Sequence, residues 1–253
     1  MKNIIKFKTL CVAATAVFGF SVAVAHAQVI SWNLDVYGTI GSGQHAGVVD
    51  AYHWNDTWLL DGNASSATEN NLMDNTGAAT ALSLTEIGTG NFWNFNPIQG
   101  SDPGADADGS SNKRLLNGYI NEGGGSLSGV TLSSIPYNMY DLYVYFSADT
   151  AERAGTVTVG STTYDFSTVG AAGISGANAS FIQTTDTTGV NPTSDYAIFS
   201  NLTGSTQTIE SDINSWGGIA GLQIVATPEP GTLALASMGG LAVLLLKRRS
   251  QKN

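Results

Sequence analysis

Residues 140–146 read Tyr-Asp-Leu-Tyr-Val-Tyr-Phe, and apolar side chains occupy every second position, at Leu142, Val144 and Phe146. Successive side chains of a β-strand point to opposite faces of its sheet, so a period of two predicts a strand with one fully apolar face. The tyrosines between these positions supply large rings to the second face. We therefore expect a central strand that is covered on both sides.

The same alternation occurs in residues 30–37, Ile-Ser-Trp-Asn-Leu-Asp-Val-Tyr, and on both sides of the pair Gly160-Ser161. Glycine accepts a positive φ without steric cost, so this pair predicts a type II′ hairpin turn. The other strand candidates are short and are separated by Gly, Asn, Asp and Ser: residues 82–87, 91–95, 115–120, 126–132, 155–159, 162–166, 180–184, 195–199, 207–211 and 219–225. Short strands without an amphipathic helix predict an all-β fold, a single antiparallel jelly-roll-like β-sandwich over residues 28–227.

Charge is distributed unevenly along the 253 residues. The chain has 20 acidic and 10 basic residues, a formal net charge of −10, but seven of the basic residues lie near the two ends. Residues 28–227 contain three basic and nineteen acidic residues, a net charge of −16. A nucleic-acid-binding surface needs clustered Lys and Arg, so this composition excludes nucleic acid as a partner. The single cysteine, Cys11, lies outside this body, which therefore has neither a disulfide nor a thiolate metal site.

The N-terminal segment has the three parts of a secretory signal peptide. Three lysines before residue 9 precede an apolar run over residues 10–24, and Ala25-His-Ala27 then forms an A-x-A cleavage site. We expect the Sec translocon to export the chain and signal peptidase to remove residues 1–27, which leaves Gln28 at the new N-terminus. The alternative is a buried N-terminal helix, but the apolar run has no polar face that such a helix would turn to water.

The C-terminal segment contains a second apolar run, sixteen uncharged residues long, which is near the lower limit for a transmembrane helix. Its parts follow one another in a fixed order: Pro228, Glu229 and Pro230, the apolar run 231–246, and the basic tail 247–253 with Lys247, Arg248 and Arg249. By the positive-inside rule the tail lies in the cytoplasm and the body lies outside. A buried core helix is the alternative.

These three parts resemble the PEP-CTERM sorting signal of Gram-negative bacteria that make extracellular polysaccharide. The resemblance covers residues 228–253 and implies that an exosortase-type membrane transpeptidase cuts near Pro228-Glu229-Pro230. It also implies transient anchoring in the inner membrane and then transfer to the cell envelope or extracellular matrix. The body resembles ectodomains that carry this signal and look like galactose-binding-like sandwiches, through five segments: residues 115–122, 130–136, 140–146, 196–203 and 219–225. That second resemblance assigns no ligand residues.

One cluster of carboxylates has the spacing of metal ligands. Asp102, Asp106 and Asp108 precede Gly109 in a stretch rich in small residues. Hard oxygen ligands around a tight turn suit Ca²⁺, so we expect a calcium site here, with a solvated acidic loop as the alternative. His45 and His53, eight residues apart with Asp50 between them, would share one face of a strand, but two ligands without a third are a weak metal signal.

Four tryptophans are candidates for carbohydrate contact. Trp54, Trp58 and Trp93 lie in segments that mix aromatic and polar residues, and Trp216 lies in a glycine-rich turn. An aromatic ring can stack on the C–H face of a sugar while polar neighbours bond its hydroxyl groups. The alternative is that the first three rings alternate into the core of the sandwich, whereas the turn around Trp216 favours exposure.

These features predict an exported, exosortase-sorted surface or matrix protein with a non-catalytic sandwich that binds or embeds in extracellular polysaccharide. No Gly-x-Ser-x-Gly motif is present, which argues against a serine nucleophile. The rival hypothesis is a polysaccharide hydrolase or lyase that uses a pair of the carboxylates. A third is an ice-binding surface, because threonine is abundant and this C-terminal signal occurs on such proteins. The sequence, however, reveals no regular Thr-x-Thr array on successive strands.

Overall fold

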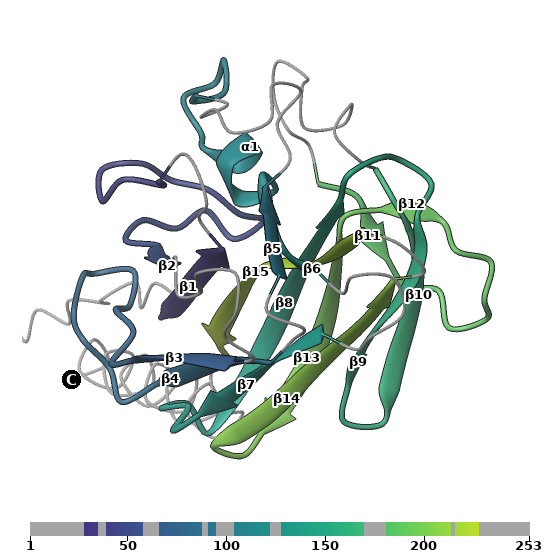
Figure 1. Ribbon diagram of the computed structural model, residues 1–253. Helices are drawn as coiled ribbons and strands as arrows, with labels where there is room; N and C mark the ends of the chain where they lie inside the picture. The colour runs from purple at the N-terminus through teal and green to yellow at the C-terminus, as the bar shows by residue number, and fades with distance from the viewer. Residues whose placement is uncertain are drawn as a thin grey trace, which may run out of the picture.

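The computed structural model describes residues 28–34, 39–57, 66–87, 91–94, 104–121, 128–169, 181–213 and 216–227. Nearly all of these residues belong to β-strands or to the turns between them, and the one helix, α1 (Asn112–Leu115), is a single turn. Two sheets face each other in two layers, which confirms the expected all-β, sandwich-like fold (Figure 1).

The first layer is a six-stranded sheet. Its order from edge to edge is β11 (Gln183–Thr184), β13 (Tyr196–Thr203), β8 (Met139–Ala148), β15 (Gly217–Ala226), β1 (Val29–Leu34) and β2 (Asn55–Thr57). Residues 140–146 therefore lie in β8, which pairs with a neighbour on each side, as predicted for a central strand.

The second layer is a seven-stranded sheet. Its order is β12 (Thr193–Ser194), β10 (Thr162–Thr168), β9 (Ala154–Val159), β14 (Thr206–Ile213), β7 (Ser128–Ser133), β4 (Ser83–Ile87) and β3 (Ser66–Asn70). Strands β9 and β10 form the predicted hairpin, in which Gly160 has φ +60°. Strands β5 (Asn91–Asn94) and β6 (Gly118–Asn121) form a separate two-stranded sheet.

The main hydrophobic core fills the space between the two large sheets. Trp32 of β1 and Val144 of β8 belong to this core, together with Leu84 and Val130 of the opposite sheet. Each of these four side chains is no more than 1% exposed. A second apolar cluster covers the outer face of the six-stranded sheet. It consists of residues from the loop 39–54, from α1 and the residue after it, from β6 and from the six-stranded sheet: Ile40, Ala46, Trp54, Leu115, Leu116, Tyr119, Tyr145, Tyr196 and Ala220.

The expected strand over residues 115–120 is wrong in its first half. The chain instead forms α1 and then enters β6 at Gly118. A strand would turn Leu115 and Leu116 to opposite faces, but both are buried in the second apolar cluster, and the helical turn brings them to the same side. Burial of both leucines explains why a helical turn forms here.

The expectation of a wholly antiparallel arrangement also needs correction. The long central strands pair antiparallel, but β2, β11 and β12 pair parallel with β1, β13 and β10. These three strands have only two or three residues each and lie at sheet edges. Strands β2, β3 and β12 were not predicted, because they are made mainly of polar residues and show no apolar alternation.

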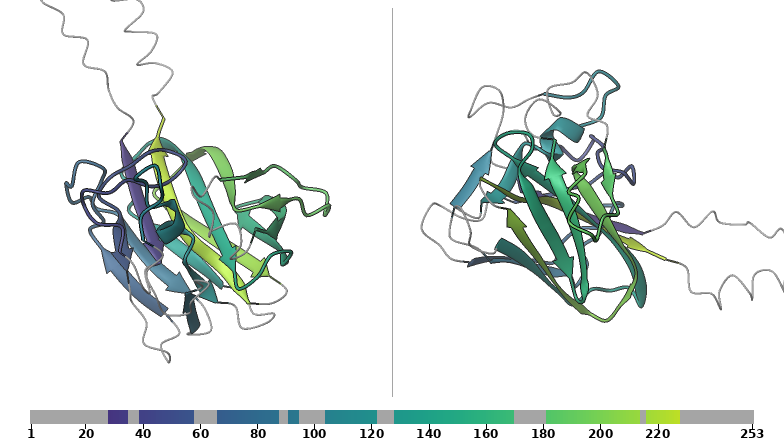
Figure 2. Two further views of the ribbon diagram at one scale, coloured as in Figure 1. Left: turned by 90° about the horizontal axis from the view of Figure 1, so that it is seen from above. Right: turned by 90° about the vertical axis from the view of Figure 1, so that its right-hand side faces the viewer.

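Both ends of the described chain leave from one end of the sandwich (Figure 2). The Ala226 N–H donates to the Gln28 carbonyl at 2.9 Å, and the Thr227 N–H donates to the Met139 carbonyl at 3.0 Å. None of the helices in the described ranges is long and apolar enough to cross a bilayer. The expected signal peptide, residues 1–27, and the expected transmembrane helix, residues 231–246, lie outside those ranges.

Candidate functional site

Most residues of the two processing signals lie outside the described part of the chain: Ala25, Ala27, Pro228, Glu229, Pro230, Lys247, Arg248 and Arg249. Gln28 is described, and its side-chain amide donates to Asp74 Oδ2 at 3.0 Å. Asp74 also accepts the backbone N–H of Thr76 and of Ala78. Burial raises the pKa of Asp74. The hydrogen bonds that Asp74 accepts, led by that of the Thr76 hydroxyl, together lower the pKa by more than burial raises it, so the net shift is downward and favours the carboxylate.

The four tryptophans have different environments. Trp54 is 3% exposed, and its indole N–H donates to the Ala51 carbonyl at 3.0 Å, so it belongs to the core beside Tyr145 and offers no ring face to a sugar. Trp216 is 47% exposed. The backbone of Trp93 lies in β5, and Trp58 lies outside the described residues. Of the two candidates whose side chains are described, Trp216 is therefore the exposed one.

Trp216 precedes β15 at the end of the sandwich opposite to Thr227. Its carbonyl accepts the Asp149 N–H at 3.1 Å. The Asp149 carboxylate in turn binds Arg153 at two points, with the guanidinium Nε and Nη2 each 3.0 Å from a carboxylate oxygen. These hydrogen bonds raise the pKa of Arg153 and hold it charged. An exposed ring and a two-point ion pair thus lie on adjoining segments.

Two of the three expected calcium ligands, Asp106 and Asp108, are described. Asp106 is 5% exposed, and its Oδ2 accepts the Ser110 hydroxyl at 3.2 Å and the Lys113 N–H at 3.1 Å. Lys113 Nζ lies 3.4 Å from the other carboxylate oxygen. The exposed Asp108 accepts the Ser110 N–H at 3.0 Å, and this bond lowers its pKa. The loop is therefore fastened to α1 through Asp106, rather than being wholly solvated.

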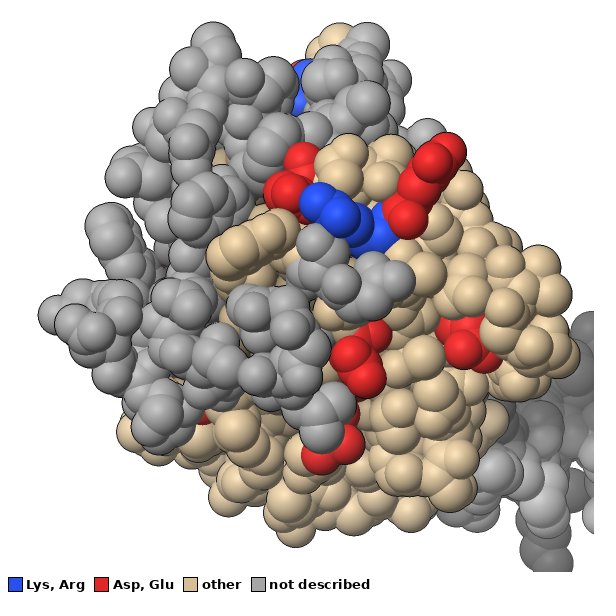
Figure 3. Space-filling model, turned by 45° about the vertical axis from the view of Figure 1, so that its right-hand side comes forward, with Lys and Arg blue, Asp and Glu red and all other residues tan. Residues whose placement is uncertain are grey.

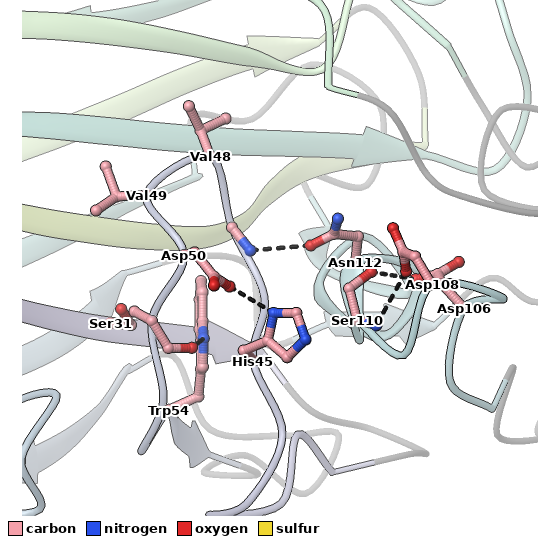
Figure 4. A network of polar contacts seen from close by, with 12 residues as sticks. Ser31, His45, Val48, Val49, Asp50, Trp54, Asp106, Asp108, Ser110 and Asn112 are labelled. Atoms are coloured by element: carbon pink, nitrogen blue, oxygen red, sulfur yellow. Dashed lines mark hydrogen bonds and ion pairs between the residues drawn. The ribbon is translucent and has the colours of Figure 1, made fainter.

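Within the described residues, no three His, Cys, Asp or Glu side chains lie close enough to hold a metal ion. Asp102, the third expected calcium ligand, lies outside those residues. The two histidines do not share a strand face either, since the chain turns at Gly47 (φ +96°). His45 Nδ1 lies 2.5 Å from Asp50 Oδ1 (Figure 4). The His45 ring is also tilted against the ring of Tyr52. His45 and Asp50 thus form a local pair that closes this turn.

A buried polar network fastens the 44–52 loop to the six-stranded sheet. Gln223, fully buried in β15, donates to the Val49 carbonyl at 2.7 Å and to Ser31 Oγ at 3.2 Å. Its carbonyl oxygen accepts the Tyr145 hydroxyl at 2.5 Å, and that hydroxyl accepts the Val48 N–H at 2.7 Å. The signal for this network was a single polar residue in the apolar stretch 219–225. Because its groups bond one another, the network has a structural role.

A carboxyl group with a strongly raised pKa faces the interior of the sandwich. Glu86 is fully buried on β4, and neither of its oxygens has a hydrogen-bond partner among the described residues. Burial, assisted by the nearby negative charge of Glu69, raises the pKa of Glu86 to about 8. Glu69 lies on the neighbouring strand β3 and its pKa is also raised by burial. Both carboxyl groups are therefore weaker acids than usual. Glu86 is fully buried, so a polymeric substrate cannot reach it.

Figure 3 shows acidic side chains scattered over the visible face, with basic side chains beside some of them; the other described residues of this face are uncharged. The outer face of the seven-stranded sheet also holds a shallow hollow of about 320 Å³, lined by Thr158, Gly160, Thr206, Gln207, Thr208 and Glu210. Three of these six residues carry hydroxyl groups.

No protein-family model matches the chain, and no curated protein is similar to it in sequence. The candidate sites consequently rest on geometry alone. Two of them are open to solvent: the end of the sandwich at Trp216, and the hydroxyl-rich outer face of the seven-stranded sheet.

Proposed function

We propose that the protein is an exported, non-catalytic module of the cell envelope or extracellular matrix that associates with carbohydrate. The sequence of its ends supports export by the Sec route and sorting by an exosortase-type transpeptidase. We also propose that its two layers form a jelly-roll sandwich of the galactose-binding-like kind. The antiparallel pairing of the long central strands supports this finer assignment.

One observation carries the proposed contact with carbohydrate: Trp216 is exposed at the end of the sandwich that faces away from Thr227. Strand β15 runs between these ends and has ten residues, so they are separated by about 33 Å at about 3.3 Å per residue. A protein anchored through its C-terminal segment would therefore hold Trp216 on the side away from the membrane.

The chemistry around Trp216 suits a sugar. Its indole ring can stack on the C–H face of a pyranose, and the Asp149–Arg153 pair on the adjoining segment can exchange hydrogen bonds with hydroxyl groups. The body carries a net charge of −16, so neutral polymers, or acidic polymers bridged by divalent cations, are the expected ligands.

The test is binding of the purified protein to immobilised polysaccharides, together with a reducing-end assay on the same samples. We expect binding without turnover, and loss of binding in Trp216→Ala. Tyr52→Ala, which removes another exposed ring at 45% exposure, is the matched control and should bind normally. Release of reducing ends, or equal binding by the Trp216 variant, would refute the proposal.

Sorting has its own test. Mass spectrometry of the surface fraction should find chains that lack residues 231–253. If only intact chains are present there, processing near Pro228-Glu229-Pro230 does not occur.

A further inference from the structure

The outer face of the seven-stranded sheet carries a straight row of four threonines. Thr68 on β3 is the register partner of Thr85 on β4. Thr85 is the partner of Thr131 on β7, and Thr131 is the partner of Thr208 on β14. Four neighbouring strands thus contribute one threonine each. The row runs across the sheet for about 14 Å, because adjacent strands lie about 4.8 Å apart.

A second polar row lies beside the first, two residues further along the strands. Its members, from β3 to β14, are Asn70, Ser83, Ser133 and Thr206. Residues two apart on a strand point to the same face, and their separation is about 6.7 Å. The two rows, which we call the hydroxyl array, form a grid of eight polar side chains.

Several side chains of the array are held in place by their neighbours. The Thr68 and Thr85 hydroxyl oxygens are hydrogen-bonded at 2.8 Å, and the Ser83 hydroxyl donates to Asn70 Oδ1 at 2.9 Å. Thr131 is half-buried on the central strand β7, whereas Thr208 is exposed. Branching at Cβ restricts the rotation of each threonine, so the array is ordered before any ligand arrives.

The array contains no ionisable side chain, although the body around it carries a net charge of −16. Charged and apolar side chains begin at the next register position, where Glu210 and Ile87 stand. The two rows also lack an aromatic ring, which a sugar would need as a stacking platform. The ligand that suits them is therefore uncharged, dense in hydrogen-bonding groups and periodic.

We propose that the hydroxyl array binds ice. Hexagonal ice repeats its oxygen atoms on a prism face at intervals close to the two spacings of a β-sheet grid. The hydroxyl groups would hydrogen-bond to water molecules of that lattice, and the threonine methyl groups would fill the spaces between them. This binding is independent of the contact proposed for Trp216, which lies outside the array.

The test is thermal hysteresis and ice adsorption of the purified protein. The wild type should separate its melting and freezing temperatures, should shape growing crystals and should be enriched in slowly grown ice. Thr131→Lys puts a long, charged side chain in the middle of the first row, and we expect it to abolish all three effects. Thr208→Tyr is a second variant at an exposed position, where folding is less sensitive, and we expect the same loss.

Thr156→Lys is the matched control. Thr156 is a half-buried threonine on the same face, on β9, outside both rows, and its variant should keep full activity. Thermal melts establish that each variant is folded. Absence of thermal hysteresis and ice adsorption in the wild type would overturn the proposal, and so would equal activity in the Thr131, Thr208 and Thr156 variants. Polysaccharide binding through Trp216 should be unchanged in all three, which separates this test from that of the proposed function.

Discussion

Glu86→Gln removes a carboxyl group that titrates inside the sandwich. Glu86 lies on the same side of β4 as Leu84, and its register partners are Val130 on β7 and Ala67 on β3. It is fully buried, and burial together with the charge of Glu69 raises its pKa to about 8. The folded protein therefore keeps this side chain protonated at pH values where the unfolded chain ionises it.

The sign and size of the effect follow from the two pKa values. Between the ordinary value of 4.5 and about 8, the folded state holds a proton that the unfolded state has lost, so stability falls as the pH rises through this window. At about 1.4 kcal/mol for each pH unit, the loss amounts to about 5 kcal/mol. A domain of this size has about 5–15 kcal/mol in total, so the loss is large. Glutamine stays neutral and avoids it.

Urea unfolding measures this directly, followed by the fluorescence of the buried Trp32 and Trp54. Near pH 5 we expect Glu86→Gln and the wild type to have similar unfolding free energies. Near pH 9 the variant should be more stable, by up to about 5 kcal/mol. Burial also raises the pKa of Asp195 to about 7, but this residue is present in both proteins and its contribution cancels in the difference.

Glu152→Gln provides the control, because Glu152 is an exposed carboxylate. This variant should follow the pH dependence of the wild type. Parallel curves for the wild type and Glu86→Gln would mean that Glu86 ionises in the folded state without cost. That result would refute the assignment of an uncharged, inward-facing carboxyl group.

Two further predictions concern the contacts that fasten the outer layers to the sheet. Tyr145→Phe removes the hydroxyl that joins Gln223 to the Val48 N–H and should cost about 1–3 kcal/mol of unfolding free energy; a loss no larger than that of Tyr52→Phe would contradict this. Gly218→Ala brings a Cβ to 1.8 Å from the Ile120 carbonyl oxygen, so β6 must move, and we expect the melting temperature to fall by an amount equivalent to about 1–3 kcal/mol. Gly43→Ala, with open space around it, should melt like the wild type.

Local periodicity was sufficient to predict the strands whose faces differ in polarity. Strand β8 and the β9–β10 hairpin follow directly from alternation and from the glycine at the turn. Strand β3 could not be found in this way, because its single apolar residue, Ala67, gives no alternating pattern; its pairing with β4 holds it in the sheet. The strand predicted to begin at Leu115 was wrong, because Leu115 and Leu116 are both buried in the second apolar cluster. This tertiary packing overrides the local pattern.

The candidate sites were less predictable, because spacing does not reveal the direction of a side chain. Trp54 and Trp216 both have polar neighbours in the sequence, yet one is 3% exposed and the other 47%. Asp106 has the spacing of a calcium ligand, but its carboxylate is directed inward to Ser110 and Lys113. In both cases the deciding contact comes from residues whose positions are known only once the chain is folded.

The hydroxyl array is the clearest example of information that the sequence holds but does not display. Thr68 and Thr85 lie on consecutive strands. Thr131 follows only after β5, α1 and β6, and Thr208 only after further strands of both large sheets. Each strand taken alone shows no more than an exposed polar face with threonines, a common composition for a β-sheet surface. A one-residue slip in any pairing would turn that strand's threonine away from the row. The apolar residues on the inner face, such as Val130 and Leu84, fix that register, so packing of the core aligns the groups proposed to bind ice.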